Sequence, residues 1–156
     1  MPQLSALPDD LSVILAHLES TYPLEGCGVV FRSADHSFRV CPLDNVYDKY
    51  HRQDAEAFPR TSATAYLIDP IQFQKASQQA LQDGYLLSCI FHSHIAVGSY
   101  FSDEDQAMAA PGQMPLFPEV SYLVVGVSRG QSTEAKLFWW ENGTFLETGV
   151  PLLSGS

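Results

Sequence analysis

The chain has 156 residues, of which 46% are hydrophobic and 12% aromatic, so it can bury a core and is unlike a disordered protein. Its formal net charge is −10, and a surface this acidic repels phosphate backbones and disfavours nucleic-acid binding. No segment approaches the ~20 apolar residues of a membrane-spanning helix.

The length suits one domain spanning residues 1–156. The cysteines Cys27, Cys41 and Cys89 are odd in number and irregularly spaced, which is unlike a disulfide framework and typical of free thiols. The N-terminus lacks a basic stretch followed by an apolar one, so no signal peptide is expected. These features favour a cytoplasmic protein.

The first part of the chain predicts a helix, two strands and a long loop. Apolar residues at helical spacing run from Leu11 to Leu18, behind the acidic pair Asp9-Asp10. Residues 26–31 are apolar and β-branched, as in a strand, and a turn at 33–36 leads into a returning strand at 37–42. Residues 44–64 are polar, aromatic and irregular, which predicts a loop.

The second part predicts two helices and four strands. One helix runs from the N-cap Asp69-Pro70 to a C-cap at Gly84, and the apolar segment 85–91 then reads as a buried strand. A loop over 92–101 precedes a short helix that begins at Ser102. A proline-rich connector and three strands complete the chain, at 111–118, 120–127, 135–140 and 144–150. Because helices interleave with strands, the predicted class is α/β with a mixed sheet.

Three residues are candidate metal ligands. His92 and His94 occupy positions i and i+2 at the end of a strand, so both imidazoles can face one point. Asp105 lies one turn into the next helix and can reach the same point. Two histidines and a carboxylate leave a fourth zinc position open for water. A His-x-His pair also occurs without a metal, and Asp105 could serve only in a capping box with Ser102.

Glu25 is the candidate proton carrier. It precedes a strand in the stretch Pro23-Leu24-Glu25-Gly26-Cys27-Gly28, whose glycines permit close backbone approach. A carboxylate at that place could accept a proton from water and return it to a leaving amine. Considered alone, a glutamate at a strand start is more typical of solvated surface.

Together these residues resemble the JAMM motif of the MPN-plus (JAB1/MPN/Mov34) metallopeptidases. The shared pattern is Glu25, His92-x-His94, seven residues, then Ser102-x-x-Asp105. The order of helices and strands is also similar over about residues 10–150, and the short form resembles bacterial stand-alone members. The resemblance implies a single-domain MPN-like, cytidine-deaminase-like fold with a mixed sheet flanked by helices.

The resemblance also implies roles. His92, His94 and Asp105 would hold Zn²⁺, Glu25 would be general base and acid, and Ser102 would stabilise the oxyanion. Asn45 falls where relatives often have an asparagine that shapes the loop.

The implied activity is that of a zinc peptidase or isopeptidase. Its substrate would be the Gly-Gly-type C-terminal tail of a ubiquitin-like or sulfur-carrier protein, either trimmed or cut at an isopeptide bond. Loops 46–64 and 111–118 could clamp such a tail, although packing of these loops onto the body is the plainer interpretation of their apolar residues.

The chain departs from the family pattern at Ile95 and Phe101, where relatives usually have prolines; this bears on loop rigidity and pocket shape.

Three alternatives remain: a catalytically inactive MPN-type scaffold, a non-catalytic metal protein and a zinc deaminase. Deaminase chemistry uses His-x-Glu and a downstream Pro-Cys-x-x-Cys, and neither occurs. No nucleic-acid or membrane partner is expected, and the sequence does not indicate an oligomeric state.

Overall fold

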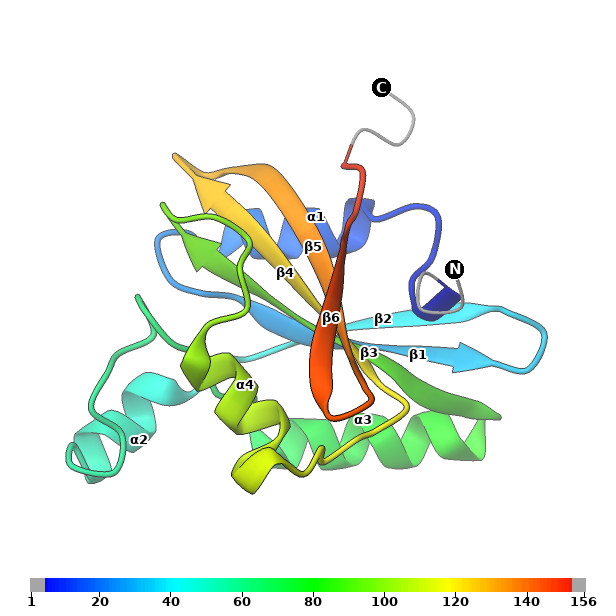
Figure 1. Ribbon diagram of the computed structural model, residues 1–156, viewed down its shortest axis with the longest axis horizontal. Helices are drawn as coiled ribbons and strands as arrows, with labels where there is room; N and C mark the ends of the chain where they lie inside the picture. Colours follow the sequence, from blue (N-terminus) through cyan, green and yellow to red (C-terminus); the bar gives the residue numbers. More distant parts are fainter. Residues whose placement is uncertain (1–4, 153–156) are drawn as a thin grey trace.

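A mixed six-stranded sheet forms the centre of the computed structural model, which describes residues 5–152 (Figure 1). The strand order is β2-β1-β3-β4-β5-β6. The strands β3 and β4 are parallel, and every other neighbouring pair is antiparallel. The strands span Cys27–Ser33 (β1), Phe38–Leu43 (β2), Tyr85–Ile95 (β3), Ser121–Ser128 (β4), Gln131–Glu141 (β5) and Thr144–Gly149 (β6).

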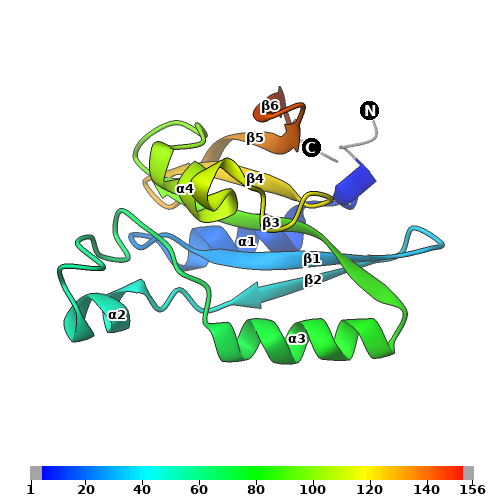
Figure 2. The same cartoon turned by 60° about the horizontal axis from the view of Figure 1, so that its bottom comes forward.

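Helices cover both faces of this sheet. The first helix, α1 (Ser12–Ser20), packs against strands β2 to β5, and α3 (Pro70–Gln82) packs against β2 and β3. Figure 2 shows α3 running alongside β1 and β2. The shorter helices are α2 (Tyr47–Gln53) and α4 (Asp103–Ala109), and a 3-10 turn at Pro111–Gln113 follows α4. Every helix among residues 5–152 is too short or too polar to cross a lipid bilayer.

Side chains that alternate along the central strands pack into two hydrophobic layers, one on each face of the sheet. Val30 packs in the layer that holds α1, whereas its neighbours Val29 and Phe31 pack in the layer beneath α3 and α4. Because side chains alternate along a strand, Ile90 of β3 shares this second layer and places His92 and His94 on the same face. The layer beneath α3 and α4 is therefore the one that leads into the candidate site.

Several sequence predictions are confirmed. The structure is a mixed α/β sheet with flanking helices. The Asp69 carboxylate accepts hydrogen bonds from the backbone nitrogens of Ile71 and Gln72, so it caps α3 as expected. Gly84, at φ +85°, follows the end of that helix. All three cysteines are free thiols, of which Cys27 and Cys89 are buried.

Three boundary predictions are wrong. The segment 44–64 is not all loop, because residues Tyr47–Gln53 form α2. The strand predicted at 135–140 begins four residues earlier, at Gln131. The strand β3 does not stop at Phe91 but continues to Ile95, since β4 pairs with it as far as Val127. The two histidines therefore stand within a paired strand rather than in the loop that follows.

Gly28 lies where β1, β2 and the Phe91 ring meet closely. A Cβ atom added there would stand 2.6 Å from the Cys41 carbonyl oxygen and would also overlap the Phe91 ring. We expect Gly28→Ala to lower the free energy of unfolding by about 1–3 kcal/mol, as overpacking of a close-packed core does. Urea denaturation of both variants measures this. Gly149→Ala is the control, since nothing lies within 4 Å of its added Cβ, and an equal loss in both variants would contradict the packing argument.

Candidate metal centre

The structure brings the three candidate ligands together from β3 and α4. The Asp105 Oδ2 atom lies 3.0 Å from His94 Nε2 and 3.3 Å from His92 Nε2. One ligand atom from each residue falls within 4.8 Å of the other two. All three side chains are buried, although Asp105 follows His94 by eleven residues in the chain. The arrangement is a possible metal site of two nitrogens and one carboxylate oxygen.

His92 supplies a test of whether a metal fits. It is fully buried, yet neither ring nitrogen forms a hydrogen bond within residues 5–152. The Tyr66 ring stacks on it, with centroids 4.1 Å apart, and closes one face of the imidazole. A buried polar atom without a hydrogen bond is costly; Nε2 has only the 3.3 Å contact with Asp105, and a cation placed between the two would satisfy both atoms. The residues present therefore fit a bound metal.

The electrostatics of the centre favour the protonation states that metal ligands need. Complete burial lowers the pKa of His92, against the opposing effect of Asp105. Burial acts to raise the pKa of Asp105, but contact with the His92 and His94 imidazoles outweighs burial and holds that pKa below its ordinary value. A neutral imidazole at His92 and an ionised carboxylate at Asp105 are the metal-binding forms of these two side chains.

A capping box holds Asp105 in place. The Ser102 hydroxyl oxygen accepts a hydrogen bond from the Asp105 backbone nitrogen at 3.0 Å, and the Asp105 carboxylate accepts one from the Ser102 nitrogen at 3.1 Å. Capping and ligand geometry are thus compatible, because one Asp105 carboxylate oxygen serves both. The Ser102 hydroxyl hydrogen has no acceptor within residues 5–152 in this arrangement, so it can be donated to a ligand.

Glu25 lines the same cavity as His94, Ser102 and Asp105. Its side chain is only 5% exposed, which overturns the plainer interpretation of a solvated glutamate. Burial, followed by repulsion from Asp105, raises the pKa of Glu25 to about 9. A carboxyl group perturbed in this way beside possible metal ligands is typical of a proton-transfer site.

Asn45 fixes the backbone around Glu25. Its side-chain nitrogen donates hydrogen bonds to the carbonyl oxygens of Glu25 and Ala65, at 2.8 and 3.0 Å. Its side-chain oxygen accepts from the backbone nitrogens of Tyr47 and Leu67. The predicted loop-shaping role of Asn45 agrees with these four bonds, which join Glu25, just before β1, to both ends of the segment that holds α2.

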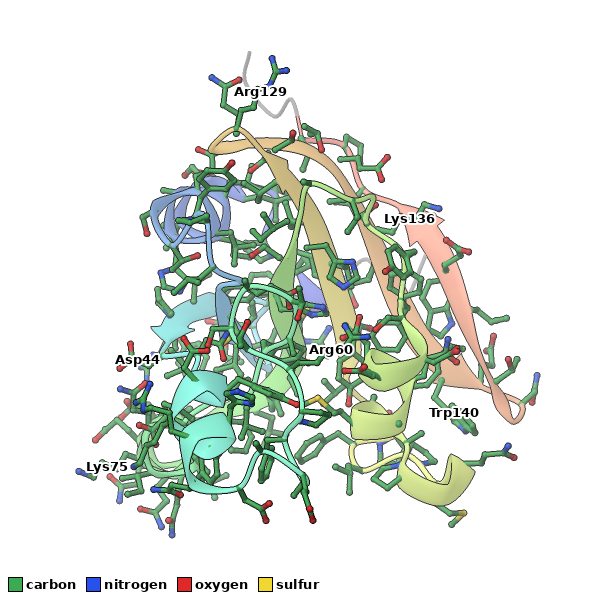
Figure 3. The ribbon with its side chains drawn as sticks, turned by 90° about the vertical axis from the view of Figure 1, so that its left-hand side faces the viewer. Asp44, Arg60, Lys75, Arg129, Lys136 and Trp140 are labelled. Atoms are coloured by element: carbon green, nitrogen blue, oxygen red, sulfur yellow. The ribbon has the colours of Figure 1, made fainter. Side chains whose placement is uncertain are left out.

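Two residues that line the cavity form an ion pair, and the cavity has a volume of about 160 Å³. Arg60 Nε lies 2.6 Å from Glu104 Oε1, so the segment after α2 touches α4. Figure 3 shows Arg60 between these two elements. Both side chains are about half exposed, so the pair contributes under about 1 kcal/mol to stability.

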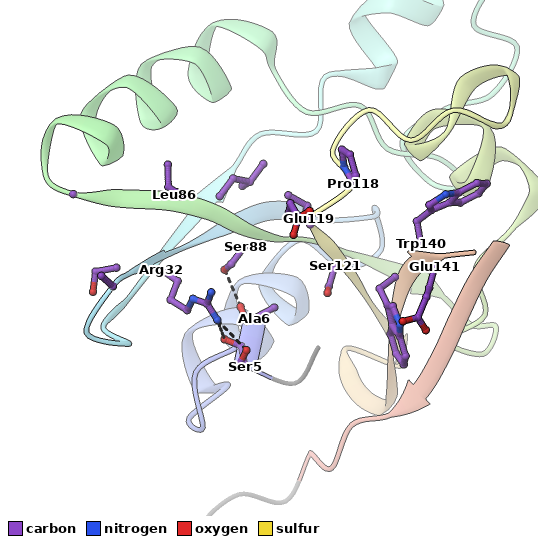
Figure 4. A pocket seen from close by; sticks show the side chains of 16 residues that line it. Ser5, Ala6, Arg32, Leu86, Ser88, Pro118, Glu119, Ser121, Trp140 and Glu141 are labelled. Atoms are coloured by element: carbon purple, nitrogen blue, oxygen red, sulfur yellow. Dashed lines mark hydrogen bonds between the residues drawn. The ribbon is translucent and has the colours of Figure 1, made fainter. Parts of the chain in front are cut away.

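A larger cavity, of about 760 Å³, lies elsewhere (Figure 4). It is lined by the start of β3 at Leu86 and Ser88, the start of β4 at Ser121, and the end of β5 at Trp140. His92 and His94 stand at the other end of β3. Size alone does not locate the chemistry of this protein.

Some residues of the site were not predicted. Tyr66 and Arg60 belong to a segment with no periodic pattern, so nothing in the sequence alone points to their contacts with His92 and Glu104. Tyr100 packs edge-on against His94, with ring centroids 4.8 Å apart, and lay in a predicted loop. The only sequence signal for these three was their place in the long loops that flank the motif.

Comparisons with known proteins agree with the fold described above. In fold, the chain is similar to a solution structure of a protein from Desulfitobacterium hafniense, with 24% identity, a TM-score of 0.65, and coverage of 89% of this chain and 85% of that one. It is also similar to a solution structure of a protein from Salinibacter ruber, with 22% identity, a TM-score of 0.58, and coverage of 91% and 86%. No protein of curated function matches the chain. The family described as prokaryotic homologs of the JAB domain (Prok-JAB) matches residues 8–141, and the chain therefore belongs to that family.

Proposed function

We propose that the protein is a zinc-dependent peptidase or isopeptidase that cleaves the C-terminal tail of a ubiquitin-like or sulfur-carrier protein. The observation that carries this proposal is the buried trio of His92, His94 and Asp105, with Glu25 in the same cavity, in a chain of the Prok-JAB family. Two imidazoles and one carboxylate suit zinc and leave a coordination position open, as catalytic zinc sites do.

In the proposed reaction, water adds to a peptide or isopeptide carbonyl and the carbon–nitrogen bond breaks, giving a carboxylate and an amine. A zinc ion held by the three ligands would acidify water, polarise the carbonyl and lower the pKa of Glu25 through its charge. The Glu25 carboxylate takes the proton from the attacking water and returns it to the leaving nitrogen. The Ser102 hydroxyl donates a hydrogen bond to the developing oxyanion.

A second cavity beside the first supports a polypeptide substrate. It measures about 230 Å³, is lined mainly by apolar side chains, and shares Tyr66 and Met108 with the cavity that holds Glu25. Leu116, from the 111–118 connector, lines it and is 58% exposed. Of the apolar residues in the two candidate clamping loops, Tyr47 is instead buried and packs on Phe58. The connector is therefore the better supported of the two clamps.

A cleavage assay tests the proposal. The zinc-loaded protein is incubated with a β-grasp carrier whose Gly-Gly terminus bears five added residues, and the masses of the products are measured by mass spectrometry. We expect release of the added residues after the second glycine, and a rate about 10²–10³-fold lower for Ser102→Ala, as loss of an oxyanion donor causes.

A carrier that ends in Ala-Ala before the same extension is the matched control substrate. Absence of cleavage of extended tails and of Gly-Gly isopeptide conjugates, in a protein that holds zinc, would contradict the proposed substrate. A protein that takes up no zinc at all would instead favour an inactive MPN-type interaction module.

A further inference from the structure

His94 belongs to a row of three residues across the sheet. It is paired with Gly126 on β4, and Gly126 is paired with Glu134 on β5. Paired residues on adjacent strands point to the same face, and Glu134 Cγ would lie 3.5 Å from a Cβ atom at Gly126. The glycine leaves the middle of the row without a side chain.

The segment between β3 and α4 occupies the place that Gly126 leaves open. The Val97 carbonyl oxygen would stand 3.1 Å from a Cβ at Gly126. Figure 1 shows this segment crossing beside the end of β4 on its way to α4. The backbone here is held between the two side chains of the row, His94 on one side and Glu134 on the other.

Both side chains bind that backbone, at adjacent residues. Glu134 Oε1 accepts a hydrogen bond from the Ser99 nitrogen at 2.7 Å, and His94 Nδ1 lies 3.2 Å from the Gly98 carbonyl oxygen. Ser99 is buried, whereas Glu134 is exposed to solvent. The hydrogen bond between them therefore joins a buried backbone nitrogen to a surface carboxylate. The hydrogen bond from Ser99 also holds the pKa of Glu134 below its ordinary value, so the acceptor is an anion.

We propose that Glu134 is a positioning residue for the metal centre, acting through Ser99 and Gly98 on His94. A carbonyl oxygen can only accept, so a fixed Gly98 carbonyl requires the proton on His94 Nδ1. When a cation lies between Nε2 and the Asp105 carboxylate, which are 3.0 Å apart here, the lone pair on Nε2 is then available to bind it. Partners behind a histidine ligand commonly set its tautomer and orientation in this way. The inference rests on the metal site of the proposed function and is independent of the bond that is cleaved.

Two substitutions at Glu134 separate this role from a general loss of structure. Glu134→Ala removes the acceptor for the Ser99 nitrogen, and Glu134→Gln keeps an acceptor oxygen of similar shape. The control is Glu147→Ala, since Glu147 is another exposed acid on the same side of the sheet and, within residues 5–152, pairs with Lys136 alone. Zinc affinity is measured by competition with a chromogenic chelator, and the His94 Nδ1–H by nitrogen-15 NMR of the zinc-loaded protein.

We expect Glu134→Ala to weaken zinc binding by roughly 10-fold, at the low end of the range for partners that support a ligand. The His94 Nδ1–H of the zinc-loaded variant should also exchange with solvent faster, because the Gly98 carbonyl is no longer held in place. Glu134→Gln and Glu147→Ala should match the original protein in both measurements. Unchanged zinc affinity and unchanged Nδ1–H exchange in Glu134→Ala would overturn the inference, as would equal losses in the alanine and glutamine variants. If the original protein bound no zinc, the proposed function would fail, and this inference would fail with it.

Discussion

Glu25→Gln should lower the rate of tail cleavage by about 10²–10⁴-fold while the protein retains one zinc ion per chain. This range is what a positioned general base or acid typically contributes. The amide is close in size to the carboxyl group, so the cavity it shares with Ser102 and Asp105 keeps its shape, but an amide cannot carry the proton from water to the leaving nitrogen. Turnover under saturating substrate, together with zinc content after dialysis, measures the effect.

The pH dependence of the unfolding free energy of zinc-free Glu25→Gln provides an independent test of the raised Glu25 pKa. Because the pKa of Glu25 is raised from 4.5 to about 9, the folded state binds a proton that the unfolded state releases, so the original protein loses stability as pH rises through this window. The loss is about 1.4 kcal/mol per pH unit, and Glu25→Gln lacks it. Urea denaturation with a chelator should therefore show the variant gaining up to about 4 kcal/mol over the original between pH 5 and pH 8. Near-normal turnover, or lost zinc, would refute the assigned role.

His92→Ala and Asp105→Ala should each abolish stoichiometric zinc binding. Each removes one of three ligands, so the loss in affinity should exceed the roughly 100-fold effect of removing a residue that only supports a ligand. Zinc content after extensive dialysis, measured beside the original protein, checks this. About one zinc per chain in the original protein and almost none in either variant is the expected result.

The design must separate loss of a ligand from loss of a fold. Asp105→Ala also removes part of the capping box, which costs roughly 1 kcal/mol. Asp105→Asn keeps the size of the side chain and an acceptor oxygen for the Ser102 nitrogen, yet it removes the charge that a divalent cation needs. Asp103→Ala is the control, since Asp103 is an exposed acid in the same first turn of α4. Zinc retained in Asp105→Asn and His92→Ala would exclude this trio as the metal site.

The sequence predicted those parts of the fold and site that depend on local patterns. Apolar periodicity and capping residues located most helices and strands, and the spacing of His92, His94 and Asp105 located the possible metal centre. It did not predict α2, whose only buried residue is Tyr47, because a helix with one buried side chain has no apolar face to detect. It also ended β3 before His92, because polar residues at a strand end resemble a loop until a neighbouring strand pairs with them.

Contacts between segments far apart in the chain were beyond reach from the sequence. Glu134 reads as an ordinary exposed acid on a strand, and its bond to Ser99 depends on the pairing of β4 with β5. Tyr66 stacks on His92, and Asn45 bonds Ala65, the residue before Tyr66, as well as Glu25, just before β1. Such contacts follow from tertiary packing, which no periodic pattern encodes.

The two tryptophans of the chain, Trp139 and Trp140, both line the large cavity at the end of the sheet remote from the imidazoles. Trp139 is buried, so its emission reports on the integrity of the fold. Indole fluorescence therefore arises in a different part of the protein from the cavity lined by Glu25. Unfolding curves of the variants can be followed optically without the signal itself being altered by whatever occupies the cavity beside Glu25.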